Sequence, residues 1–194
     1  MAVYTHLGAE DLAKLIAHYD VGELRSAKGI AEGISNSNWL IETSGPDGQG
    51  ARYILTMYER RIELTVLPYF LGLLDHLSAN GCQVPRTIHD SEGADFRMER
   101  GKAVALIEFL PGVSPTQPTP DQARSVGEVL AQIHLASAGF VPTRANTMDF
   151  ASNAKVLEAC GIEGLESLNH DLHTMLDPAR DAAPPYAPGE RERL

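Results

Sequence analysis

The sequence predicts an α+β fold in which a five-stranded antiparallel sheet with one main helix is followed by helices only. Three strand-like runs joined by tight turns come first, at 24–30, 38–43 and 52–58. A long helical pattern follows at 64–80, with Pro68 in its first turn and Gly81 just past its end. From about residue 121 onward the apolar residues recur at helical spacing.

Composition limits the kind of protein. The chain has 194 residues, of which 43% are hydrophobic and 22% charged, as expected for a folded domain. Its net charge of −10 argues against binding to nucleic acid or to an anionic membrane surface. No apolar run approaches the roughly 20 residues that cross a bilayer. The two cysteines, Cys82 and Cys160, suggest neither a disulfide framework nor a zinc site. We therefore expect a cytoplasmic protein without nucleic-acid or membrane partners.

The hairpin at 29–39 is the stretch most suggestive of ligand binding. Gly29 and Gly33 precede a small polar run, Ser35 to Asn38. Small residues leave backbone N–H groups uncovered, and glycine permits unusual φ values, so such a hairpin can approach a bound anion. An ordinary polar turn has the same composition. The hairpin therefore predicts a phosphate-binding segment, with a plain turn as the alternative.

The other elements follow in order. A short amphipathic helix is expected at 9–19, and extended segments at 82–89, 96–99 and 102–109. Prolines then mark a linker at 111–120, where we place the boundary between lobe 1–110 and the helical lobe 121–176. Thr119 and Gln122 form a capping box that starts a helix. Its expected buried face comprises Val126, Val129, Leu130 and Ile133. Short helices are expected at 151–159 and 162–176, and a disordered tail at 177–194.

This order of elements is that of a protein-kinase-like fold. Four blocks of residues indicate which family with this fold the chain resembles. The blocks are Gly29 to Trp39, Tyr53 to Arg60, Leu67 to Phe70 and Val126 to Ala136. In this order and at these separations they closely resemble bacterial homoserine kinases of the aminoglycoside-phosphotransferase-like type. The resemblance covers roughly residues 1 to 160.

The resemblance implies an activity and a set of ligands. Members of this family use ATP and Mg²⁺ to phosphorylate the side-chain hydroxyl of L-homoserine, a step toward threonine. Ser35, Asn36, Ser37 and Asn38 would lie over the ATP phosphates. Glu108, Phe109 and Leu110 would form the hinge strand, whose backbone faces the adenine. Related kinases that act on aminoglycosides, choline or methylthioribose share the architecture and remain an alternative.

One position departs from the wider kinase pattern. Kinases place a phosphate-pairing lysine on the third strand and pair it with a helix glutamate. Here no lysine occurs between Lys28 and Lys102, and Thr56 stands in the lysine position. Thr56 therefore joins the expected nucleotide-binding residues. Arg60 or Arg61 would supply the charge instead, with a solvated strand exit as the alternative, and Glu63 is the candidate ion-pair partner on the helix.

The catalytic loop of the superfamily has the pattern His-x-Asp with an asparagine five residues after the aspartate. After residue 134 the nearest match surrounds Asp171, but Asn169 replaces the histidine and Leu176 replaces the asparagine. An exposed turn of an amphipathic helix explains this stretch better than a catalytic loop. We therefore expect neither a catalytic nor a metal-binding residue in this chain, which reads as an inactive N-terminal fragment. A catalytically empty nucleotide-binding or interaction module is the alternative.

Overall fold

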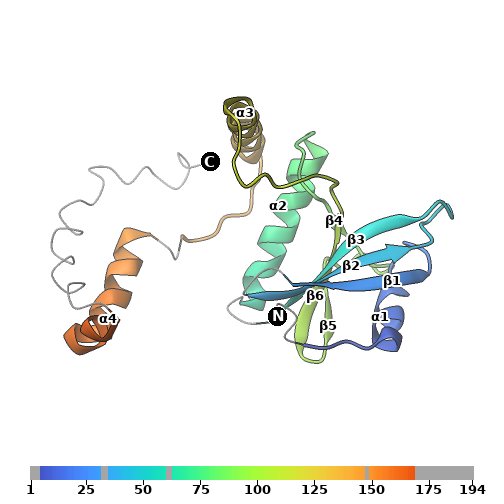
Figure 1. The fold of residues 1–194 in the computed structure, drawn as a ribbon, viewed down its shortest axis with the longest axis horizontal. Coiled ribbons are helices and arrows are strands. Elements are labelled where there is room, and N and C mark those ends of the chain that lie inside the picture. Colours follow the sequence, from blue (N-terminus) through green and yellow to red (C-terminus); the bar gives the residue numbers. More distant parts are fainter. Residues whose placement is uncertain (1–4, 32–34, 60–62, 147–148, 169–194) are drawn as a thin grey trace. The chain divides into compact units, whose positions relative to one another are not determined.

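The computed structural model describes residues 5–31, 35–59, 63–146 and 149–168, and it divides the chain into two compact units, 1–142 and 143–194 (Figure 1). The first unit contains the sheet and three α-helices. Its elements in chain order are α1 (Ala9–Ile16), β1 (Leu24–Ile30), β2 (Asn36–Thr43), β3 (Ala51–Tyr58), η1 (Leu64–Val66), α2 (Leu67–Ala79), β4 (Thr87–Ile88), β5 (Arg97–Glu99), β6 (Lys102–Glu108) and α3 (Pro120–Ser137).

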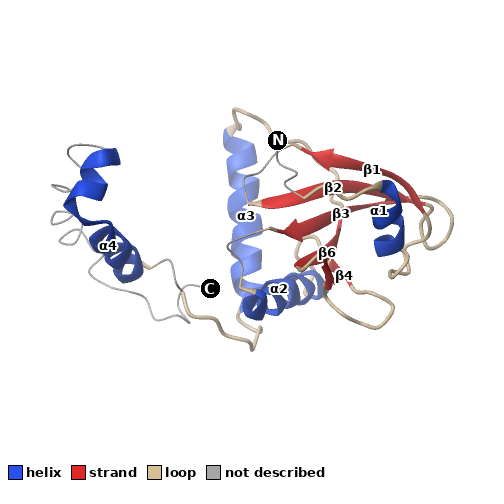
Figure 2. Cartoon of the chain, turned by 90° about the horizontal axis from the view of Figure 1, so that it is seen from below, coloured by secondary structure: helices blue, strands red, loops and turns tan. Residues whose placement is uncertain are grey.

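The sheet is antiparallel, with strand order β1-β2-β3-β6-β4, and β5 pairs separately with β6. The expected meander of the first three strands is confirmed (Figure 2). The sheet has six strands rather than the expected five, because the short β4 and β5 both pair with β6. Strand β2 begins at Asn36, two residues earlier than predicted.

Helices cover the two faces of the sheet differently. Alternate strand residues point to opposite faces. On one face Trp39, Ile41 and Leu55 pack in a single cluster with Leu12 and Ile16 of α1. On the other face Leu67 and Leu71 of α2 pack against Ala103 and Ala105 of β6. Because α2 reaches the β6 side of this second face, the part over β1, β2 and β3 keeps half-buried side chains.

Helix α3 lies against α2 within the first unit. The two helices are joined where His76 Nε2 lies 2.9 Å from the Ala136 carbonyl oxygen and where the ring of Phe140 packs 5.4 Å from that of Tyr69. His76 is therefore a contact residue between the two helices. The predicted linker 111–120 lies inside this unit.

The start of α3 matches its sequence, but its packing does not. Thr119 and Gln122 form the expected reciprocal capping box. The predicted buried face is wrong in part, because Val126 is 58% exposed and Leu130 48% exposed. His134 is also exposed. The contacts with α2 come from the C-terminal end of α3 instead.

The second unit contains α4 (Phe150–Leu168), which is interrupted at Gly161, where φ is +66°. Two short helices were predicted on either side of this point, and the break confirms that division. The remainder of the second predicted helix, Asp171 and the predicted tail lie outside the described residues. In the parts of the chain that the structure describes, no helix is long and apolar enough to cross a membrane.

Candidate functional site

A strip of side chains crosses the second face of the sheet beside α2. Cross-strand partners point to the same face. One row joins Ile30, Asn38, Thr56 and Ala105, and the next joins Lys28, Leu40, Ile54 and Ile107. We call Ile30, Asn38, Leu40, Ile54, Thr56 and Ile107 the apolar strip. Of these six residues, Thr56 is buried and the others are half-buried. The strip therefore offers a mostly apolar surface with two polar groups at one end.

The two polar groups are hydrogen-bonded to each other. Thr56 Oγ1 donates to Asn38 Oδ1 at 2.9 Å, and Thr56 is 8% exposed. The bond orients the Asn38 amide, whose NH₂ group can donate to a ligand. Thr56, which was predicted to stand in the position of the kinase strand lysine, thus forms a neutral pair with Asn38.

The predicted phosphate hairpin is divided between the two faces. Residues 32–34 lie outside the described residues, Ser35 is in a bend, and residues 36–38 already belong to β2. Asn36 and Asn38 share a face with the strip, because they pair with Tyr58 and Thr56. Ser37 points to the opposite face, is fully buried, and donates its Oγ hydrogen to Glu59 Oε1 at 2.5 Å. The Ser37 hydroxyl therefore does not face the strip.

Glu59 is the centre of a buried polar cluster behind the strip. Its side chain is 5% exposed and pairs with the Nζ ammonium of Lys102. Lys102 is the first residue of β6. Thr5 donates to the same carboxylate through its backbone N–H at 2.9 Å and its hydroxyl at 2.8 Å. Burial opposes the charge, but the hydrogen bonds from Lys102, Ser37 and Thr5 outweigh it and lower the pKa of Glu59 to about 2.

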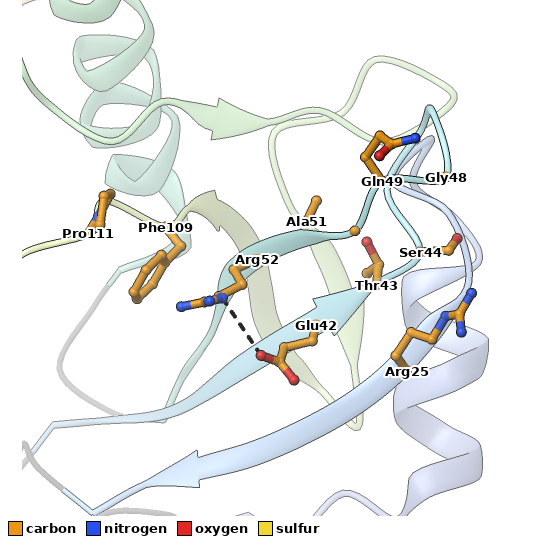
Figure 3. A pocket seen from close by; sticks show the side chains of 11 residues that line it. Arg25, Glu42, Thr43, Ser44, Gly48, Gln49, Ala51, Arg52, Phe109 and Pro111 are labelled. Carbon is orange, nitrogen blue, oxygen red and sulfur yellow. Dashed lines mark ion pairs between the residues drawn. The ribbon is translucent and has the colours of Figure 1, made fainter.

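A pocket of about 750 Å³ lies at the other end of the strip, where the predicted hinge begins (Figure 3). The Arg52 guanidinium lies 5.6 Å from the centre of the Phe109 ring, and Arg52 Nε lies 3.7 Å from Glu42 Oε1. Phe109 is therefore placed beside the strip. Glu108 pairs with Tyr53 and so points to the other face, and Leu110 is 45% exposed.

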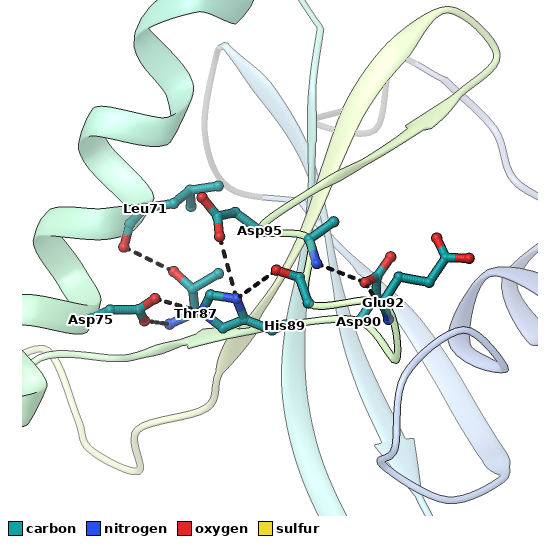
Figure 4. Close-up of polar contacts among 9 residues, drawn as sticks. Leu71, Asp75, Thr87, His89, Asp90, Glu92 and Asp95 are labelled. Atoms are coloured by element: carbon teal, nitrogen blue, oxygen red, sulfur yellow. Dashed lines mark hydrogen bonds and ion pairs between the residues drawn. The ribbon is translucent and has the colours of Figure 1, made fainter.

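A separate polar cluster ties α2 to the segment around β4 (Figure 4). Asp75 accepts from the Thr87 backbone N–H at 2.9 Å, and its second oxygen lies 2.6 Å from His89 Nε2. Asp95 Oδ1 lies 3.3 Å from His89 Nδ1. The hydrogen bond to Asp75 raises the pKa of His89, and partial burial opposes the rise. These residues hold the helix against the sheet and do not belong to the strip.

The family resemblance implies a magnesium ion, for which the sequence predicted no ligand in this chain. Within the ranges that the structure covers, no three His, Cys, Asp or Glu side chains are grouped so as to hold a metal. Asp171 is not among those residues. No ligand set for Mg²⁺ is therefore assigned to this chain.

Comparison with known proteins identifies the family. The family model described as the phosphotransferase enzyme family matches residues 26–194. The chain belongs to this phosphotransferase family. It is 43% identical over 176 residues to a homoserine kinase of Rhodopseudomonas palustris, covering 91% of this chain and 52% of that protein. It is 48% identical over 151 residues to a homoserine kinase of Allorhizobium ampelinum, covering 78% of this chain and 46% of that protein. The chain thus spans about half the length of the curated relatives it matches.

Solved phosphotransferases have the same fold. A spectinomycin phosphotransferase in complex with ADP and spectinomycin matches 95% of this chain and 60% of its own, with a TM-score of 0.68 and 17% identity. The match to an aminoglycoside phosphotransferase from Alicyclobacillus acidocaldarius covers 92% of this chain and 55% of that protein, with a TM-score of 0.54 and 15% identity. The predicted protein-kinase-like fold is therefore confirmed.

The buried pair of Glu59 and Lys102 behind the strip was not predicted from the sequence. Glu59 and Lys102 are separated by 43 positions. Glu59 lies in the block from Tyr53 to Arg60, but no pattern in that block links it to Lys102. The available signal was a glutamate directly after the third strand and a lysine at the start of the last one. Glu63, considered as an ion-pair partner, is exposed, and the structure gives it no ion pair with any described residue.

Proposed function

We propose that the chain is the nucleotide-binding half of an ATP-dependent kinase that phosphorylates the side-chain hydroxyl of L-homoserine. The observation that carries the proposal is the identity of 38–48% to proteins named homoserine kinase, over 78–97% of this chain. Family membership alone does not choose among small-molecule acceptors. The relatives named homoserine kinase favour this acceptor over choline or an aminoglycoside.

The apolar strip favours one orientation of a bound nucleotide. Leu40, Ile54 and Ile107 offer an apolar surface to a flat base, and Phe109 lies at the end where the hinge begins. Asn38 and Thr56 lie toward the hairpin, so the phosphates would lie there. Asn36 shares their face and adds a further amide. In this arrangement the nucleotide is held mainly by neutral donors.

Phosphoryl transfer also needs a group that orients the acceptor hydroxyl and ligands for Mg²⁺, which would neutralise charge on the phosphates. None of these roles is assigned to a residue of this chain. The chain's own part is to bind the nucleotide, orient its phosphates and exclude water from one side of them. Transfer to homoserine is proposed for the whole protein.

Nucleotide binding is tested by calorimetry on the 194-residue chain with ADP and MgCl₂. We expect saturable binding, and we expect Asn38→Leu to weaken it about tenfold, because a hydrogen bond to a charged group contributes roughly 1.5–3 kcal/mol. The matched control is Asn80→Leu, the same change at an exposed residue at the end of α2. Absence of binding, or equal losses in the two variants, would contradict the proposal.

The catalytic competence of this half is tested in a chimera. Residues 1–142 of this chain replace the matching part of the R. palustris relative, and ADP release is measured with and without L-homoserine. We expect release that depends on homoserine. If residues 1–142 are instead a catalytically empty module, the chimera binds ADP and transfers nothing.

A further inference from the structure

The cluster centred on Glu59 joins segments that are far apart in sequence. The Glu59 carboxylate receives hydrogen bonds from Ser37 at the start of β2, from Thr5 near the N-terminus and from Lys102 at the start of β6. Lys102 also donates to the Thr5 hydroxyl. Glu59 itself directly follows β3. The ends of three strands are therefore joined at one buried carboxylate.

This cluster lies behind the polar end of the apolar strip. Ser37, which bonds to Glu59, is the residue between Asn36 and Asn38, whose side chains point to the strip. A strand is stiff over three residues, so a displacement of Ser37 also displaces its two neighbours. The position of Asn38 relative to Thr56 therefore depends on the bond between Ser37 and Glu59.

We propose that Glu59 and Lys102 are positioning residues for the nucleotide, which hold the start of β2 against the end of β3. The inference rests on the proposed function. Kinases generally use a lysine–glutamate pair on the nucleotide face of the sheet. In this chain Thr56 stands in that place, and the lysine–glutamate pair formed by Lys102 and Glu59 lies on the opposite face. Neither member of this pair touches the nucleotide.

Burial makes the pair sensitive to the loss of one partner. The Glu59 side chain is 5% exposed and that of Lys102 31%. Removing the ammonium group leaves a buried carboxylate without its counter-charge, which is far more costly than replacing both partners. The remaining donors, Ser37 and Thr5, would then shift or water would enter. Either change releases the start of β2.

A second buried ion pair supplies a matched control. Arg97 of β5 pairs with Asp90, whose side chain is fully buried. Asp90 also accepts from the backbone N–H groups of Glu92 and Ala94, so the pair closes the turn before β5. Among the described residues, the side chains of Arg97 and Asp90 form no hydrogen bond or ion pair with β2 or β3. Loss of this pair should therefore reduce stability and leave the strip unchanged.

The experiment compares ADP with adenosine as ligands of the 194-residue chain. We measure the Kd of each ligand with MgCl₂ present, and the free energy of unfolding in urea. The variants are Lys102→Met, Lys102→Arg and Arg97→Met. We expect Lys102→Met to weaken ADP about tenfold and adenosine less than about twofold, because the pair supports the phosphate end only. Lys102→Arg should restore most of the ADP affinity. Arg97→Met should lower stability with both Kd values unchanged.

The outcomes separate the two proposals. If the unmodified chain binds neither ligand, the proposed function fails and this inference fails with it. If the chain binds ADP and Lys102→Met weakens ADP and adenosine equally, or weakens neither, the proposed function stands and the positioning role is wrong. Should Lys102→Met fail to fold, Ser37→Ala is used instead, because it removes one hydrogen bond to Glu59. We then expect ADP binding to weaken about threefold and adenosine binding to weaken less.

Discussion

His89 makes stability depend on pH through two neighbouring carboxylates. Its ring nitrogens lie 2.6 Å from Asp75 and 3.3 Å from Asp95, and its side chain is 43% exposed. The hydrogen bond to Asp75 raises its pKa in the folded protein above the unfolded value of about 6.5. The stabilisation is therefore complete below about pH 6.5 and is lost as the pH rises through the folded pKa. We predict that His89→Gln lowers the free energy of unfolding more at about pH 6 than at about pH 8.5.

Urea unfolding of both proteins at the two pH values measures this difference, and other titrating groups cancel in the comparison. Asp75→Asn is the informative second variant. Its amide oxygen can still accept from the Thr87 N–H, but it no longer carries a charge beside His89. The pH dependence assigned to His89 should then shrink. A gap between wild type and His89→Gln that is constant with pH would contradict the prediction.

At the scale of elements, the contact between the α1–β1 connection and the β2–β3 turn depends on Gly22. Gly22 has φ of +81°, and a Cβ there would lie 2.3 Å from Ser44 Oγ and 2.5 Å from the Gly45 carbonyl oxygen. Gly48 has φ of +80° with nothing within 4 Å of a Cβ. Both alanine variants share a positive-φ cost of roughly 1–2 kcal/mol. We predict that Gly22→Ala costs about 1–3 kcal/mol more than Gly48→Ala, because it also overpacks the turn.

Urea unfolding of the two variants checks this difference directly. The contact at risk contains two reciprocal bonds, from the Glu23 N–H to Ser44 Oγ at 2.9 Å and from the Ser44 N–H to the Glu23 carbonyl oxygen at 2.8 Å. Equal losses in the two variants would show that the turn moves aside to accommodate a methyl group.

Local patterns predicted the elements well where the pattern and the packing coincide. The hairpin, the third strand and α2 have strong periodicity or turn residues, and they were found close to their true bounds. Strands β4 and β5 have only two and three residues, and they become strands only by pairing with β6. Extended segments were predicted at 82–89 and 96–99, but which of their residues join the sheet depends on pairing with β6, a contact between segments that local signals do not determine.

The candidate site divides in the same way. Thr56 and Asn38 were predicted from motif positions, and the register of β2 and β3 brings them together. The same register turns Ser37 and Glu108 to the opposite face. A motif identifies a stretch of chain but does not determine which side chains face the ligand. The pair of Glu59 and Lys102 was missed because a buried ion pair between two strand ends has no local sequence signature.

For the whole molecule, the exposed apolar surface of α3 favours self-association. The chain spans about half the length of its curated relatives, and α3 exposes apolar side chains that the first unit does not cover. Val126 and Leu130 lie four positions apart on one helix face, at 58% and 48% exposure. Adjacent exposed apolar residues favour association, because their burial removes apolar surface from water.

We predict that the 194-residue chain self-associates through this face and that Leu130→Lys reduces the association several-fold without lowering the free energy of unfolding. Sedimentation velocity over a range of concentrations measures the first effect and urea unfolding the second. Gln132→Lys is the matched control, since it adds the same charge to an exposed position of the same helix that lies off this face. It should leave association unchanged, apart from the small effect of one positive charge on a chain of net charge −10. A chain that stays monomeric at every concentration would show that the exposed face of α3 drives no association.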